Sequence, residues 1–188
     1  MATLTSLAGG SMARFTRRFM GALVLDPVTF EDVEADRHAG AQAALVVLLA
    51  CAGGGLAAVG SSSMTLVTFV AGMAITLGAW TVWALLITTL GTQVFPEPQT
   101  SSRPGELLRT MAFAAAPGVF LAFGAMSSAA PLALAVASIW MMAATVLAVR
   151  QALDYRSMGR AVVVCVTAWL LTFGIIAAAG MLLARPVS

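Results

Sequence analysis

Few side chains in this chain of 188 residues are equipped for chemistry. It contains one histidine, His38, and two cysteines, Cys51 and Cys165. A metal site needs several ligands at suitable spacing, and these three side chains show no such spacing. No nucleotide-binding loop and no nucleophile motif appears either. We therefore expect no metal site and no cofactor, and we expect both cysteines to pack as small hydrophobic side chains.

The ionisable side chains lie in three short windows. Eight Asp and Glu and ten Arg occur in the chain, and all except Arg185 fall within residues 14–37, 97–109 and 150–160. Catalysis or ion-coupled transport inside a membrane usually needs ionisable groups there, so any chemistry would have to use these windows. Seven side chains could converge at such a rim: His38, Arg103, Glu106, Arg109, Asp154, Arg156 and Arg160. We favour the alternative, a rim that binds lipid head groups and forms internal ion pairs, and expect no enzyme.

Long stretches without charge separate the windows. Residues 38–96, 110–149 and 161–184 contain no Asp, Glu, Lys or Arg. Hydrophobic residues make up 60% of the chain and charged residues 10%, against about 25% charged in soluble domains. These numbers indicate an integral membrane protein. Basic residues do not alternate with aromatic residues outside the N-terminal segment, so we expect no nucleic-acid partner.

The charge-free stretches predict an all-α polytopic membrane protein with a bundle of five transmembrane helices. A helical span needs about 20 apolar residues. A polar turn at residues 60–63 divides the first stretch, and a Pro- and Gly-rich loop at residues 91–106 follows the second span. We expect a membrane domain over residues 39–184 and an external tail over residues 185–188. The expected spans cover residues 40–59, 64–90, 107–126, 131–149 and 161–183.

The distribution of arginine predicts the orientation. Nine of the ten arginines fall on one side of the expected spans, and Arg185 alone falls on the other. Arginine is concentrated in cytoplasmic loops of membrane proteins. We therefore expect a cytoplasmic N-terminus and an external C-terminus. Since every basic residue is Arg, which is typical of a GC-rich genome, we expect the plasma membrane of a bacterium.

The segment over residues 1–38 precedes the first span and predicts two short helices. The first, over residues 11–24, is amphipathic and interfacial: apolar side chains occupy one face and arginines the other. The apolar face consists of Met12, Phe15, Phe19 and Leu23. The opposite face consists of Arg14, Arg17 and Arg18, which we expect at lipid head groups. This helix either anchors the N-terminus or recruits a partner.

The second short helix covers residues 27–38. Asp26 is placed to cap it and Pro27 to occupy its first position. We expect Phe30 and Val33 to face the membrane. The helix also carries an acidic face, which is either solvated or a docking site for a basic partner; it consists of Glu31, Asp32, Glu34 and Asp36.

Two features within the spans suggest a cavity. Pro117 lacks a backbone N–H and is expected to kink the third span, which either shapes a cavity or fits the bundle. Trp140 and three further tryptophans either line a groove for lipid or ligand, or pack between helices; the three are Trp80, Trp83 and Trp169.

Four segments together resemble the Yip family of membrane proteins. They are Asp-Pro-Val-Thr-Phe at residues 26–30, Leu-Leu-Arg with Phe-Ala-Ala-Ala-Pro at residues 107–117, the stretch over residues 140–153 that ends in Arg-Gln-Ala-Leu, and Ser-Met-Gly-Arg-Ala at residues 157–161. The resemblance implies five spans and a cytoplasmic N-terminus. It also implies a Ypt/Rab-type GTPase partner, which we do not transfer to a bacterial chain.

We expect a scaffold, assembly or membrane-organising protein that acts through its cytoplasmic face. Its partners would be membrane lipids and another membrane protein or a second copy of itself. The expected interaction residues are Arg103, Glu106, Arg109, Arg150, Arg156 and Arg160. The alternative is an uncoupled transporter or lipid-handling protein with a groove near Pro117 and the tryptophans.

Overall fold

The described chain is 88% helical. The computed structural model describes residues 2–60, 65–98, 100, 103–126, 128 and 130–183, and within these residues there is no strand. Most of the predicted polar turn at residues 60–63 lies outside the described residues, as does the predicted external tail at residues 185–188.

Five helical segments are long and apolar enough to cross a membrane, so the predicted five-helix bundle is confirmed. The third segment changes from α-helix to 3₁₀-helix partway along its length. The segments are α3 (Gly40–Gly60), α4 (Leu66–Thr89) with the π-turn η2 (Leu90–Val94), α5 (Pro104–Ala114) with the 3₁₀-helix η3 (Ala116–Ala125), α6 (Ala130–Ala152) and α7 (Met158–Leu183).

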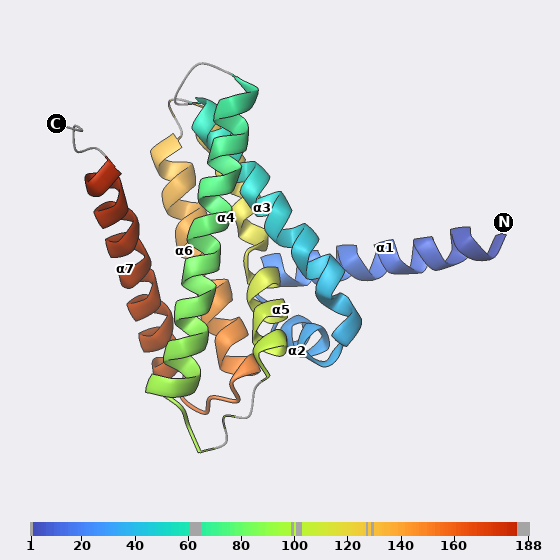
Figure 1. Cartoon of the computed structure of the whole chain (residues 1–188). Helices are drawn as coiled ribbons and strands as arrows, with labels where there is room; N and C mark the ends of the chain where they lie inside the picture. Colours follow the sequence, from blue (N-terminus) through green and yellow to red (C-terminus); the bar gives the residue numbers. More distant parts are fainter. Residues whose placement is uncertain are drawn as a thin grey trace.

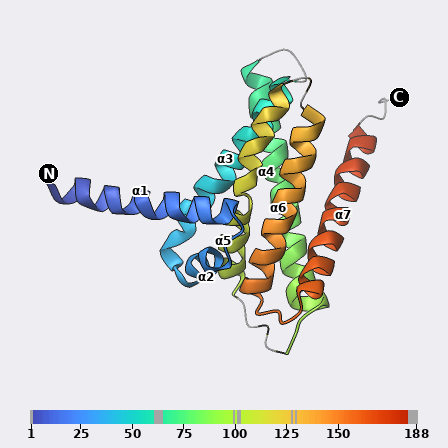
Figure 2. The same ribbon diagram turned by 180° about the vertical axis from the view of Figure 1, so that it is seen from behind.

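Two helices and a short turn precede the bundle. Helix α1 (Ala2–Leu23) begins well before the predicted residue 11 and projects sideways from the bundle (Figures 1 and 2). Helix α2 (Pro27–Ala35) has Asp26 as its N-cap, whose carboxylate accepts the Val28 N–H at 3.1 Å. The 3₁₀-turn η1 (Arg37–Ala39) then leads into α3.

The spans pack around α3 and the α5–η3 segment. Helix α3 contacts α4, α5 and η3, and α6 contacts α5, η3 and α7. Helix α7 lies at the edge of the bundle beside α4 and α6 (Figures 1 and 2). Its C-terminal part is exposed on all faces from Phe173 to Leu182.

Glycines allow α3 and η3 to approach closely. A Cβ atom added to Gly53 would lie 2.6 Å from the Gly118 carbonyl oxygen, and one added to Gly118 would lie 2.7 Å from the Ala50 Cβ. Small residues at helix contacts allow such approach in membranes, where dispersion between packed helices replaces much of the hydrophobic effect.

Pro117 marks the change of helix type in the third span. Helix α5 ends at Ala114, and in the following 3₁₀-helix the Gly118 N–H donates to the Ala115 carbonyl at 2.8 Å. Because proline has no N–H, it interrupts the α-helical bonding pattern here. Pro117 is buried at the start of this 3₁₀-helix.

The prediction that Phe30 and Val33 face the membrane was wrong. Both side chains are fully buried, and α2 packs against α5 and α6. Phe30 belongs to the same apolar cluster as Phe113 and Ala148. An apolar helix face is stable against lipid or protein, but a close-packed protein surface offers more dispersion contacts. Helix α2 is therefore part of the bundle core.

Candidate functional site

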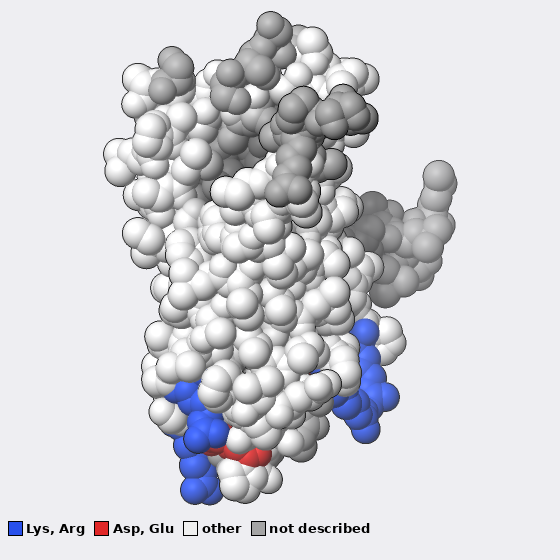
Figure 3. Space-filling view, turned by 60° about the vertical axis from the view of Figure 1, so that its left-hand side comes forward, with Lys and Arg blue, Asp and Glu red and all other residues white. Residues whose placement is uncertain are grey.

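The three charged windows meet at one end of the bundle, which we call the charged end. The Arg109 Nη2 donates to the Glu34 carbonyl at 2.8 Å, and the Gln151 Nε2 donates to the Glu31 carboxylate at 2.6 Å. Arg160 and Glu97 form an ion pair at 3.3 Å. Figure 3 shows the basic and acidic side chains gathered toward this end, with the rest of the described surface uncharged in that view.

The buried side chain of Arg18 bonds α1 to α2 and α3. Its side chain is 5% exposed. It donates from Nε to Asp32 at 2.9 Å, from Nη2 to Asp36 at 2.9 Å and from Nη1 to Gln42 at 3.0 Å. The head-group contact expected for Arg18 is therefore replaced by internal bonds, since the fold supplies two carboxylates within reach. Two residues of the acidic face of α2, Asp32 and Asp36, are thus bonded within the fold, whereas Glu31 is exposed.

The network shifts the pKa values of its members. The hydrogen bond from Arg18 lowers the pKa of Asp32 below its usual 3.8. The pKa of Asp36 is lowered most by the hydrogen bond from the His38 backbone N–H and next by the hydrogen bond from Arg18. The hydrogen bond to Asp32 raises the pKa of Arg18. All three shifts favour the charged forms, as expected for groups whose ionised states are bonded in the fold.

Arg14 and Arg17 remain on the surface of α1. Arg14 is exposed, and the Arg17 side chain is 70% exposed with a single 3.4 Å contact to Asp32. Their contact with lipid head groups, and the interfacial position of α1, stay predictions.

Tyr155 holds the loop between α6 and α7 against the end of the second span. Its hydroxyl lies 2.7 Å from the Gly91 carbonyl oxygen and 2.9 Å from that of Phe95. The residue is 3% exposed, and burial raises the pKa of its phenol. Sequence reasoning missed Tyr155, although a lone tyrosine in a polar loop between spans is a signal for such a bond.

A polar cavity of about 420 Å³ opens at the charged end between α2 and the α6–α7 loop. Burial raises the pKa of Glu34, and the nearby Asp154, Glu106 and Glu31 carboxylates raise it further. Asp154 adopts the left-handed conformation with φ of 54°, which is uncommon for a residue other than glycine. The cavity is lined by Glu31, Glu34, Arg150, Gln151, Asp154, Tyr155 and Arg156.

The six predicted rim residues divide among four places. Arg150 and Arg156 line the polar cavity. Arg103 and Glu106 lie at the start of α5, where the Glu106 carboxylate accepts the Arg103 backbone N–H at 3.1 Å. The remaining two, Arg109 and Arg160, bond separate segments.

Of these two, Arg160 bonds Glu97 and the Pro96 carbonyl at 2.9 Å. Arg109 bonds the Glu34 carbonyl. The rim is thus one polar layer with several separate bonding groups, and the polar cavity is the part of it where side chains of the first and third charged windows meet.

Trp140 has a packing role. Its indole N–H donates to the Leu23 carbonyl at 2.9 Å, and its ring stacks on Phe120 with centroids 5.2 Å apart. It therefore holds the end of α1 against the bundle. Cys51 and Cys165 are free and buried, and the described residues contain no group of three His, Cys, Asp or Glu placed to bind a metal ion.

Comparison with known proteins identifies the family. The family model described as the Yip1 domain matches residues 20–179, a range that begins near the end of α1 and includes nearly all of the five spans. No curated protein and no solved structure matches the chain. Together with the five apolar helices, the match shows a multi-pass membrane protein. The chain belongs to the Yip1 domain family.

Proposed function

We propose that this protein is a non-enzymatic scaffold or assembly factor that binds a partner through its charged end. The observation that carries this proposal is the polar cavity between α2 and the α6–α7 loop. It unites side chains from the first and third charged windows, and its volume of about 420 Å³ accommodates a side chain of a partner.

The electrostatics of the cavity favour a basic partner. Three carboxylates, Glu31, Glu34 and Asp154, share the cavity with two arginines. The mutual repulsion that contributes to the raised pKa of Glu34 would be relieved by a cation placed among them. The partner class is therefore a basic segment of another membrane protein or of a second copy. The GTPase partner implied by the family resemblance forms no part of this proposal.

The charged end lies in the cytoplasm in this proposal. Nine arginines are found in the three windows that build it, and cytoplasmic loops carry the excess of arginine in membrane proteins. The membrane is the plasma membrane of a bacterium, which the arginine-only composition favours. A membrane-impermeant thiol reagent applied to intact cells should label a cysteine placed at Leu132 and should spare one placed at Arg156.

A pull-down tests the scaffold role. The protein is purified from membranes in a mild detergent, and a partner should be recovered in a stoichiometric amount. Glu31→Gln combined with Asp154→Asn should remove the partner, because both changes take negative charge from the cavity. Arg14→Gln, an exposed change outside the cavity, should retain it. Repeated recovery of the protein alone would count against the scaffold role.

An apolar groove supports the alternative, a lipid-handling protein. It has a volume of about 280 Å³ and lies among α4, η3, α6 and α7, where Trp80, Trp83 and Trp169 line it. The Trp83 Nε1 is buried with no hydrogen-bond partner among the described residues. Pro117 and Trp140 are not among its lining residues. Lipid flux in liposomes that falls with Trp83→Ala would favour this alternative, and no flux over a broad lipid panel would end it.

A further inference from the structure

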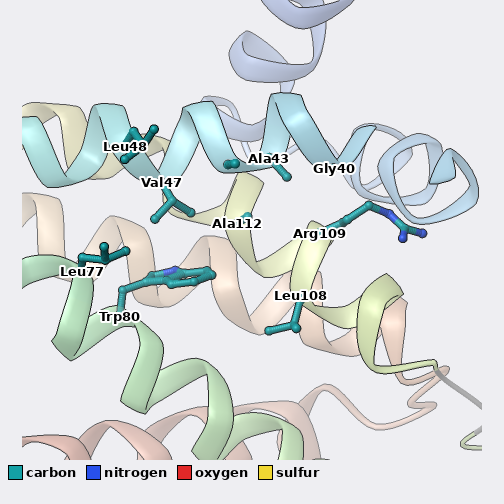
Figure 4. A pocket seen from close by; sticks show the side chains of 10 residues that line it. Gly40, Ala43, Val47, Leu48, Leu77, Trp80, Leu108, Arg109 and Ala112 are labelled. Carbon is teal, nitrogen blue, oxygen red and sulfur yellow. The ribbon is translucent and has the colours of Figure 1, made fainter. Parts of the chain in front are cut away.

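A second apolar groove runs along α3, α4 and α5 and ends at an arginine (Figure 4). Its volume is about 380 Å³, and Arg109 is the one charged residue among its described lining residues. We propose that this groove binds an acyl chain of an anionic phospholipid whose phosphate is held by Arg109. This site is separate from the polar cavity, so it stands or falls independently of the scaffold role.

Small residues create the groove and leave it open to lipid. On α3 the wall begins at Gly40, where an added Cβ atom would meet no atom within 4 Å. The wall continues to Leu48, eight residues further along α3. At 1.5 Å per residue the groove is about 12 Å long, comparable to the roughly 15 Å depth of one leaflet of the hydrocarbon core. Leu48 and Leu77 are 49% and 40% exposed, so the groove opens on the surface that faces acyl chains.

Arg109 has the position and the free donors for a phosphate. Figure 4 shows its side chain at the end of the groove opposite Leu48 and Leu77, with the guanidinium directed away from Trp80. A guanidinium has five N–H donors. The Nη2 bond to the Glu34 carbonyl occupies one of them, and the buried Nε has no partner among the described residues. The long stem therefore lines an apolar wall while the charge reaches the head-group level.

Arg109 makes no ion pair with a carboxylate among the described residues, as is also true of Arg14, Arg37, Arg150 and Arg156. Within the described part of the chain, ion pairs form at Arg17, Arg18, Arg103 and Arg160, and none forms at Arg109. A half-buried arginine with no direct ion pair is stabilised by an anion that accepts its remaining hydrogen bonds. Phosphate suits it, because planar guanidinium donors match phosphate oxygens in geometry.

Two carboxylates near Arg109 weaken its attraction for free anions, so the site favours ligands that also bind in the groove. Glu34 lies close enough to Arg109 for their charges to interact, and Glu106 interacts with Glu34. These carboxylates weaken the long-range attraction for anions. A single exposed ion pair contributes only about 0–1 kcal/mol, so free phosphate binds poorly. An anionic lipid combines the direct phosphate contact with burial of its chain.

Native mass spectrometry with two lipids of identical chains tests the proposal. The purified protein is mixed with equimolar 1-palmitoyl-2-oleoyl-phosphatidylglycerol and -phosphatidylcholine in detergent. One retained phosphatidylglycerol is expected, with about tenfold preference over phosphatidylcholine, because the choline cation of phosphatidylcholine offsets the charge of its phosphate and is repelled by Arg109. Arg109→Gln should abolish the preference. Arg103→Gln, the same change at the N-cap of the same helix and outside the groove, should keep it.

A variant that fills the groove tests how much the groove contributes to lipid retention apart from the charge of Arg109. Gly40→Leu places a side chain in open space and should reduce retention of both lipids at least fivefold, since the chain loses its contact surface. Gly78→Leu is the matched control, because an added Cβ atom there also meets nothing within 4 Å and Gly78 is not a lining residue. Glycerol phosphate without acyl chains should not displace the lipid.

Three results would overturn the proposal. They are equal retention of the two lipids by the wild type, equal losses in Arg103→Gln and Arg109→Gln, and equal losses in Gly40→Leu and Gly78→Leu. Displacement by glycerol phosphate would instead identify a simple anion site. Thermal unfolding of each variant in detergent shows whether it is folded, and Gly40→Leu keeps the proposal testable if Arg109→Gln does not fold.

Discussion

The adjacent arginines Arg17 and Arg18 provide a sharp test of how α1 and α2 are held on the bundle. The perturbation is Arg18→Met, which keeps an apolar stem and removes the guanidinium. The matched change, Arg17→Met, alters the neighbouring residue in the same way. The side chains differ in environment, because Arg18 is 5% exposed and Arg17 is 70% exposed.

The expected magnitude follows from the bonds that each guanidinium makes. Arg18 donates three hydrogen bonds of 2.9 to 3.0 Å, each contributing about 1 kcal/mol. The carboxylates of Asp32 and Asp36 are 41% and 27% exposed, so water partly satisfies them after the change. We expect a loss of about 2–3 kcal/mol for Arg18→Met and of about 0–1 kcal/mol for Arg17→Met.

Hydrogen exchange of the α2 amides measures this loss directly. Since 1.4 kcal/mol is a tenfold change in an equilibrium constant, amides that exchange by local opening should exchange about 30- to 150-fold faster in Arg18→Met. In Arg17→Met the acceleration should stay below about fivefold. Amides in the middle of α6 serve as an internal reference. Similar acceleration in both variants would refute the conclusion that the hydrogen bonds of buried Arg18 hold α1 and α2 on the bundle.

Three further predictions concern stability, each measured as thermal unfolding in detergent. Glu34→Gln should stabilise the protein at pH 7. The pKa of Glu34 is raised above its usual 4.5, so the folded state favours the neutral carboxyl group. The wild type therefore loses stability as pH rises through the pKa of the folded state, and the neutral Gln does not. The difference from wild type should vanish below pH 4.5, and a constant difference would contradict it. Phe30→Ala should cost about 3–5 kcal/mol, because the side chain is fully buried between helices; a loss below about 1 kcal/mol would mean that Phe30 faces lipid. Gly118→Val should destabilise strongly, because its Cβ would approach the Ala50 Cβ to 2.7 Å; unchanged stability would show that α3 and η3 separate at no cost.

The sequence determines the number of spans because of the high free-energy cost of placing charge within a bilayer. The three charge-free stretches therefore predict five spans, and the structure has them. The N-cap role of Asp26 was also readable, since capping depends on residues adjacent in the chain. Local signals of this kind do not require knowledge of the packing.

Contacts between distant segments were not readable in the same way. The apolar face with Phe30 and Val33 fits lipid and protein equally well by composition, so its burial against α5 and α6 depends on packing. The same holds for Arg18, because its pairing with Asp32 and Asp36 requires α1 to lie across α2. The polar cavity joins residues of α2 to the α6–α7 loop, more than a hundred positions apart. A single sequence does not indicate that residues so far apart in the chain lie in contact.

Site-specific photo-crosslinking in intact cells tests the central claim that the charged end binds a partner. A photoreactive residue replaces Arg156, which is exposed and lines the polar cavity. A second variant carries it at Leu132, which is 70% exposed in the first turn of α6 at the opposite end. A discrete protein adduct from position 156, lost with Glu31→Gln and Asp154→Asn and missing from position 132, is the predicted result. No adduct at position 156, or the same adduct at both positions, would contradict the claim.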